Sequence, residues 1–105
     1  MLPVRLYPHD DVKVIETLTK DLGAGGLRCL SPSKRTVPSP VSLEITLGLG
    51  EKPLTLRARI VWVEVVPHSE QFYLGLDFRD LSPDDTIRLS RYLERISSHL
   101  TPSKF

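Results

Sequence analysis

The sequence predicts a mostly β protein, a six-stranded antiparallel β-barrel followed by one C-terminal α-helix. Over most of the 105 residues, apolar and polar side chains alternate, which is the period of a half-buried strand. Clusters of glycine, proline and aspartate divide this stretch into six short segments. After residue 82 the apolar side chains recur every three or four positions, as on one face of a helix. Six short strands and one helix favour a small, closed or nearly closed barrel with the helix packed on it.

The first three strands are predicted at residues 3–7, 12–19 and 27–31. The first ends at the turn-forming residues 8–11, and the second is rich in β-branched side chains, which favour strands. Residues 21–26 separate the second strand from the third and hold three glycines in four positions, which requires a tight turn.

Three further strands are predicted at residues 41–47, 54–66 and 71–78, after a proline-rich surface loop at residues 31–40. After Ile60 both faces of the long fifth strand are apolar, so we expect its end to be buried on two sides or to lie under the helix. The alternation places one set of its side chains on a common face: Leu54, Leu56, Ala58, Ile60 and Trp62.

The helix is predicted to begin at Pro83, after Ser82 as its capping residue and with two aspartates in its first turn. It is expected to end before Thr101-Pro102. Its apolar stripe consists of Leu89, Leu93, Ile96 and Leu100. We therefore expect one domain over residues 1–105, with the barrel at about 3–80 and the helix at about 83–100.

The composition excludes several classes of protein. Fourteen Lys and Arg against 13 Asp and Glu give a net charge of +1, which argues against duplex nucleic acid binding through bulk positive charge. No apolar run is long enough to span a bilayer, and the first ten residues hold no apolar signal segment. The lone Cys29 has no partner for an intrachain disulfide. The expected compartment is the cytoplasm.

The residue patterns predict neither an enzyme nor a metal site. His9, His68 and His99 have no recurring metal-ligand spacing, and Cys29 lies in a strand away from any predicted base, as a buried structural thiol would. No nucleophile elbow, phosphate-binding loop or paired-carboxylate constellation is present.

The turn Asp-Leu-Gly-Ala-Gly-Gly at residues 21–26 is the candidate binding feature. Its glycines permit a positive φ or the close approach of a ligand or strand, and Asp21 can accept two hydrogen bonds from a guanine edge. Equally, Asp21 can cap the turn of an ordinary hairpin. Spacing alone leaves both interpretations open.

Five segments together resemble the PilZ domain family, over about residues 2–100: Leu-Pro-Val-Arg-Leu (2–6), Asp-Leu-Gly-Ala-Gly-Gly-Leu (21–27), Ile-Val-Trp-Val (60–63), Tyr-Leu-Gly-Leu-Asp-Phe (73–78) and Leu-Ser-Pro (81–83). The resemblance implies a six-stranded barrel with a C-terminal helix. It also implies a non-enzymatic bacterial regulatory module that binds the second messenger cyclic di-GMP and then alters partner proteins.

The family's ligand signatures carry over in part. Asp21 and Gly26 match its Asp/Asn-x-Ser-x-x-Gly turn, while Gly23 replaces the serine. The second signature, an Arg-x-x-x-Arg arm before the first strand, has no counterpart in Met1 and Leu2. Arg5 and Arg28 complete the candidate ligand-binding residues.

Arginine recognises phosphate and guanine bidentately, so we expect this chain alone to bind cyclic di-GMP weakly or not at all. The same spacing recurs at residues 91–95 in the helix, where a solvated face is the expected role.

Two alternatives remain. One is a ligand-independent adaptor that contacts a protein partner. Tyr73, Val61, Val63 and Val65 would suit such a partner or a homodimer if their side chains face outward. The other is a small barrel that binds single-stranded nucleic acid. That function ranks third because the aromatic side chains of Trp62, Phe72, Tyr73 and Phe78 are assigned to the core. No cofactor is expected.

Overall fold

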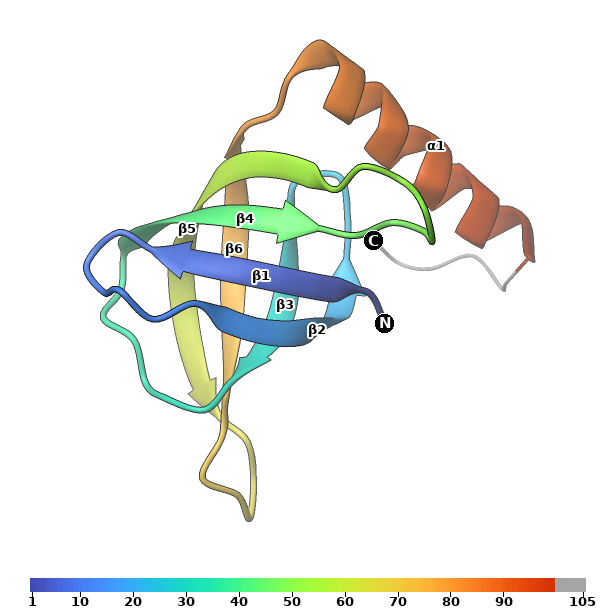
Figure 1. Ribbon diagram of the computed structural model, residues 1–105. Coiled ribbons are helices and arrows are strands. Elements are labelled where there is room, and N and C mark those ends of the chain that lie inside the picture. The colour runs from blue at the N-terminus through green and yellow to red at the C-terminus, as the bar shows by residue number, and fades with distance from the viewer. Residues whose placement is uncertain (100–105) are drawn as a thin grey trace.

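The computed structural model describes residues 1–99 of the chain. Its elements are β1 (Pro3–Pro8), β2 (Ile15–Leu22), β3 (Gly26–Ser31), β4 (Ser39–Ile45), β5 (Leu54–Val65), β6 (Phe72–Asp80) and α1 (Pro83–His99). The predicted fold class is confirmed: the strands form a closed antiparallel barrel in the order β1-β2-β3-β6-β5-β4. Figure 1 shows α1 beside the end of the barrel that holds the loop between β4 and β5.

The core is the interior of the barrel, and alternation along each strand fills it. Strand β4 shows this pattern, because the inward side chains of Val41, Leu43 and Ile45 are fully buried while the residues between them are half-buried. Their partners come from the flanking strands, since Leu43 lies opposite Leu6 of β1 and Leu56 of β5. Further fully buried apolar side chains among the described residues are Val4, Leu6, Leu54, Ile60, Leu74 and Cys29.

The second strand begins later than the β-branched sequence indicated. The Asp11 carboxylate accepts a hydrogen bond of 3.1 Å from the backbone N–H of Lys13, which holds this segment in a turn. Val12 is consequently 96% exposed, and the strand starts at Ile15, whose side chain is buried. At its other end β2 continues to Leu22.

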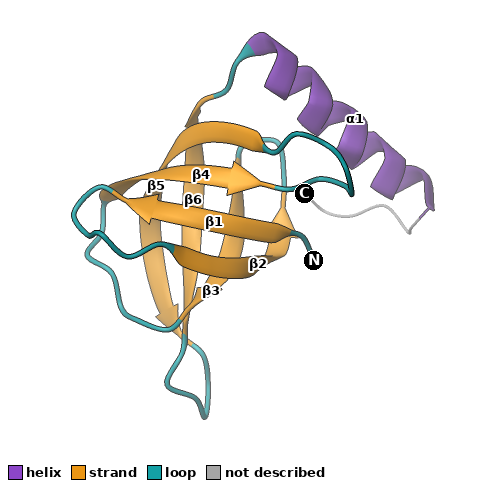
Figure 2. Ribbon diagram, viewed as in Figure 1, coloured by secondary structure: helices purple, strands orange, loops and turns teal. Residues whose placement is uncertain are grey.

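The helix is capped as predicted and packs part of its predicted apolar stripe, Leu89 and Leu93, on the barrel. The backbone N–H of Asp85 donates to Ser82 Oγ at 3.1 Å. Leu89 is buried, and Leu93 packs against the core together with Tyr92, which the stripe had not included. Figure 2 shows that α1 lies outside the strand layer and covers one end of it. Leu100, the last predicted member of the stripe, lies outside the described residues.

The Cys29 thiol is enclosed in the core, and burial raises its pKa to about 12. We expect a thiol-specific disulfide reagent to leave Cys29 unmodified at mildly alkaline pH until denaturant unfolds the chain. Because the folded protein keeps a proton that the unfolded thiol, with a pKa near 9.0, loses, the free energy of unfolding should fall as the pH rises from 9.0 toward 12. Rapid modification of the folded protein would contradict this description of the core.

Within the described residues, no helix is long and apolar enough to cross a membrane. Nor does any group of three or more side chains there have the composition of a metal site.

Candidate functional site

The glycine turn joins β2 to β3 and lies directly against β6. The N–H of Gly23 donates to the carbonyl of Gly26 at 2.9 Å, which closes the turn, and the carbonyl of Gly25 accepts a hydrogen bond of 2.9 Å from Phe78. A Cβ at Gly26 would lie 2.1 Å from the carbonyl oxygen of Leu76, whereas one at Gly25 would have nothing within 4 Å. Close approach of β6, rather than a positive φ, is therefore what requires glycine at position 26.

A bulge in β2 turns Asp21 to the outer surface of the barrel. Thr19 faces the core and pairs with Cys29, so simple alternation would point Asp21 inward as well. The pairing instead shifts between Thr19 and Asp21, which leaves Lys20 as an extra residue and places Asp21 opposite Arg28. The Asp21 carboxylate and the Arg28 guanidinium form an ion pair of 2.6 Å.

A second bulge, in β5, turns Trp62 to the same outer surface. The register shifts between Ile60, which pairs with Leu76, and Trp62, which pairs with Gly75. Trp62 is 39% exposed, so the prediction that it shares the buried face of Ile60 is wrong. Val63 packs against the core instead.

The indole of Trp62 lies over Gly75, where a Cβ would come within 2.0 Å of the ring. Glycine at this position in β6 therefore leaves the room that the indole occupies.

The two bulges create one row of side chains across four strands. Asp21 of β2 lies opposite Arg28 of β3, which lies opposite Gly75 of β6, which lies opposite Trp62 of β5. This row and the glycine turn border a cavity of about 680 Å³. The full lining is Asp21, Gly23, Ala24, Gly25, Gly26, Leu27, Arg28, Val61, Trp62, Gly75, Leu76 and Asp77.

Arg28 is held from two sides. Besides its ion pair with Asp21, the guanidinium lies over the ring of Tyr73, with 4.9 Å from its carbon to the ring centroid. The Nε of Arg28 is buried and has no hydrogen-bond partner within the described part of the chain. The arrangement fixes the orientation of Asp21, whose carboxylate can receive a pair of N–H donors from a planar ligand.

The predicted site residues do not all meet. Asp21, Gly23, Gly26 and Arg28 line the cavity together. Arg5 does not: it lies on the outer face of β1, where its Nε is 2.9 Å from the carboxylate of Glu16.

Sequence reasoning missed the wall of the cavity that β5 and β6 form, which consists of Val61, Trp62, Gly75, Leu76 and Asp77. One sequence signal could have revealed the β5 part of this wall. The stretch after Ile60 is apolar on both faces, and a bulge produces such a pattern because it changes which face of the strand is buried.

Comparisons with known proteins agree with this architecture. The sequence pattern of the PilZ domain family matches residues 1–95 of this chain. Among solved structures, the inhibitor of motility from Bacillus subtilis (MotI/DgrA) is similar at 20% identity and a TM-score of 0.78, over 93% of this chain and 47% of that one. The present chain thus spans about half the length of that protein.

Two single PilZ domains are also similar. The PilZ domain of YcgR from Escherichia coli, solved with c-di-GMP, has 14% identity and a TM-score of 0.69, over 93% of this chain and 83% of that one. The PilZ domain of CeSA from a cellulose-synthesizing bacterium has 20% identity and a TM-score of 0.64, over 91% and 92%. No curated protein matches the chain. The family's sequence pattern covers nearly the whole chain, and the structure has the six-stranded barrel and C-terminal helix that the resemblance implied. The chain therefore belongs to the PilZ domain family.

Proposed function

We propose that this chain is a non-enzymatic regulatory module of cyclic di-GMP signalling in the bacterial cytoplasm, and that the glycine-turn cavity receives a guanine of the ligand. The observation that carries the proposal is the row of side chains in which a fixed carboxylate and an exposed indole border one cavity. The similarity to a PilZ domain solved with c-di-GMP supports it.

The cavity offers the two contacts that a guanine requires. The N–H groups of the guanine Watson–Crick edge donate to a carboxylate, and Asp21 presents one that Arg28 holds in place. The face of the base can stack on the indole of Trp62, a contact worth about 1–3 kcal/mol for a base on an aromatic side chain. Gly75 leaves the room that the indole occupies.

The cavity is poorly suited to the phosphates. Its charged lining consists of two carboxylates, Asp21 and Asp77, and one guanidinium, Arg28, which is already paired with Asp21. Cyclic di-GMP carries two negative phosphodiesters, which this lining repels. We therefore propose that the cavity alone binds the ligand weakly and that tight binding requires cationic groups outside it.

Titration of the chain with cyclic di-GMP tests this proposal. Trp62 is the single tryptophan of the chain, so stacking of a guanine should quench its fluorescence. We expect a saturable quench with a dissociation constant weaker than micromolar, confirmed by calorimetry. Cyclic di-AMP, whose adenines lack the paired N–H donors, should quench less.

Two variants locate the binding. Asp21→Ala should abolish the quench, whereas Asp80→Ala, which removes an exposed carboxylate that does not line the cavity, should not change it. Sub-micromolar affinity would refute the claim that the cavity cannot neutralise the phosphates. A complete lack of binding would refute the guanine assignment and favour a ligand-independent adaptor.

The adaptor is the second candidate function, because apolar side chains are exposed on this protein. Val65 is 60% exposed at the end of β5, and Leu49 is fully exposed in the loop between β4 and β5. Single-stranded nucleic acid still ranks below both. Trp62 is exposed, contrary to its core assignment, and could stack on a base. However, the cavity beside it has two carboxylates and one guanidinium in its lining, which repels the phosphates of a nucleic acid backbone.

A further inference from the structure

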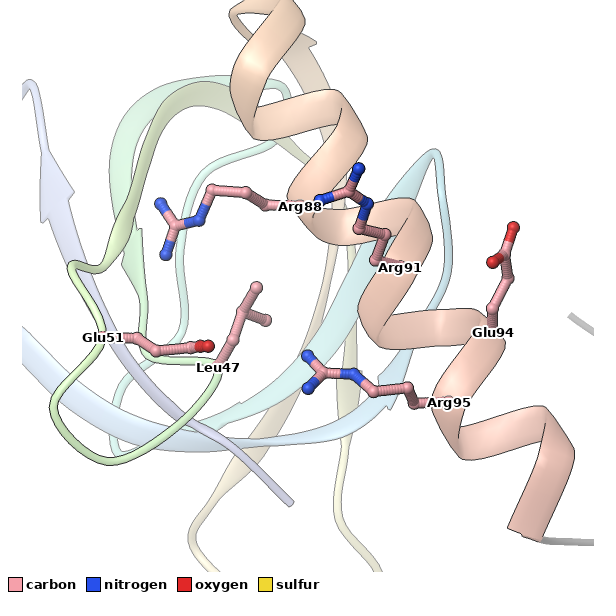
Figure 3. A pocket seen from close by; sticks show the side chains of 6 residues that line it. All are labelled: Leu47, Glu51, Arg88, Arg91, Glu94 and Arg95. Atoms are coloured by element: carbon pink, nitrogen blue, oxygen red, sulfur yellow. The ribbon is translucent and has the colours of Figure 1, made fainter.

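The two ends of β5 differ in how the rest of the chain holds them. At the start of the strand, the loop from β4 is tied to α1. Arg88 of the helix forms an ion pair of 3.3 Å with Asp85 and donates from Nη2 to the backbone carbonyl of Lys52 in the loop. Figure 3 shows Arg88 extending from α1 toward this loop. At the other end, β5 continues past its pairing with β4 as far as Val65 (Figure 1).

This far end of β5 is an edge strand in an otherwise closed barrel. The last pair between β4 and β5 joins Ser39 to Ile60, whereas β5 and β6 stay paired as far as Val65 and Phe72. Over residues 61–65, β5 thus has a neighbouring strand on one side only. We call this segment the open edge of β5. An edge strand presents backbone N–H and C=O groups with which another extended chain can pair.

One hydrogen bond of the hairpin identifies the open groups. The N–H of Val66 donates to the carbonyl of Gln71 at 3.0 Å, so the backbone groups of Val66 face the β6 side. Successive residues of a strand direct these groups to alternate sides, and the pairing with β6 is regular from Trp62 to Val65. Val63 and Val65 therefore direct their N–H and C=O groups away from β6. Within residues 1–99, no backbone hydrogen bond from a loop reaches them.

We propose that the open edge of β5 binds an extended segment of a partner protein, which adds an antiparallel strand with a basic side chain opposite Glu64. Glu64 is exposed and forms no ion pair with any other described residue. A strand bonded to Val63 and Val65 would face Glu64 in a non-hydrogen-bonded pair, where opposing side chains lie closest. The side chain of Val65, 60% exposed, adds apolar contact.

Charge argues against a second copy of this chain as the occupant. Two copies in which Val63 and Val65 bond to each other, the register that uses every open group, would place Glu64 directly opposite its own image. Like charges in that position are destabilising, whereas lysine or arginine there is stabilising. The inference goes beyond the guanine site, because Val63, Glu64 and Val65 do not line the glycine-turn cavity.

The test uses the fluorescein-labelled synthetic peptide Ser-Thr-Val-Lys-Val-Thr-Ser, with binding to the chain followed by anisotropy in the absence of cyclic di-GMP. We expect saturable binding. N-methylation of both valines, whose N–H groups would donate to β5, should weaken the affinity about tenfold or more, as the loss of two hydrogen bonds does. N-methylation of the lysine, whose N–H would point away from β5, should leave the affinity unchanged.

A charge reversal in the chain tests the pairing with Glu64. Glu64→Lys should weaken binding of the lysine peptide and strengthen binding of the same peptide with glutamate in place of lysine. The matched control is Glu51→Lys, the same change at an exposed position beyond the other end of β5, which should leave the preference for lysine as it is.

A proline in the chain tests the backbone contact. Val65→Pro removes one open N–H and no hydrogen bond to β6, which is the position that proline tolerates in an edge strand. It should weaken binding severalfold, whereas Val65→Thr, which keeps the N–H, should bind as the native chain does. Circular dichroism and urea unfolding establish that the variants are folded.

Three outcomes would overturn the proposal: no saturable binding of the lysine peptide, equal effects of N-methylation at valine and at lysine, or the same preference for lysine in Glu64→Lys as in the native chain. Light scattering that shows a dimer of the native chain, dissociated by Val65→Pro, would also overturn it, because a second copy would then occupy the edge. Since no cyclic di-GMP is present, each outcome is separate from a failure of the guanine assignment.

Discussion

Gly26→Ala is expected to destabilise the barrel by about 3 kcal/mol or more, the range of severe overpacking in a rigid environment. The new methyl group would lie 2.1 Å from the carbonyl oxygen of Leu76. That oxygen belongs to the backbone of β6, which pairs with a strand on each side, so it cannot rotate away as a flexible side chain would. The clash must separate β3 from β6 where Gly26 pairs with Asp77, and it should also displace the wall of the glycine-turn cavity.

Urea unfolding followed by circular dichroism measures this effect, and Gly25→Ala is the matched control. A Cβ at position 25 meets nothing within 4 Å, so that variant should stay within about 0.5 kcal/mol of the native chain. Equal stability of the two variants would mean that β6 does not approach the turn as closely as described.

Leu43→Ala is expected to cost about 3–4 kcal/mol of unfolding free energy, as large-to-small changes in closed cores do. The Leu43 side chain is fully buried and lies between its partners Leu6 and Leu56 on the two flanking strands. A closed barrel cannot collapse onto the missing atoms without disturbing the hydrogen bonds of three strands at once.

The control for this variant is Leu49→Ala, the same chemical change at a fully exposed position. It should change the free energy of unfolding by no more than about 0.5 kcal/mol. If Leu43→Ala were equally mild, the interior of the barrel would have to be more compliant than its packing indicates.

Alternation and capping made the fold predictable from the sequence. Residues 41–47 show why, because strict period-two alternation identifies both the strand and the side that faces the core. The helix start was equally clear, since Ser82, Pro83 and the two aspartates each satisfy a local requirement of a helix N-terminus.

The candidate site was predictable only in its glycine turn, since the other wall depends on strand pairing. Alternation carried past Ile60 puts Trp62 in the core, and carried past Thr19 it points Asp21 inward. Both positions are reversed by one extra residue whose presence depends on the neighbouring strand. Arg28 was named as a candidate, but its ion pair with Asp21 follows only from the shifted register.

The bulges also determine how this sequence must be aligned with relatives. Elsewhere in a strand, losing one residue exchanges the inner and outer faces of everything that follows. Deletion of Lys20 or of Val61 would instead restore regular pairing with the neighbouring strand, and Asp21 and Trp62 would still face outward. A relative can lack the two bulges. An alignment that forbids single-residue gaps at these positions would then place the cavity residues of this chain opposite core residues of such a relative. A binding site that the two proteins share would be missed.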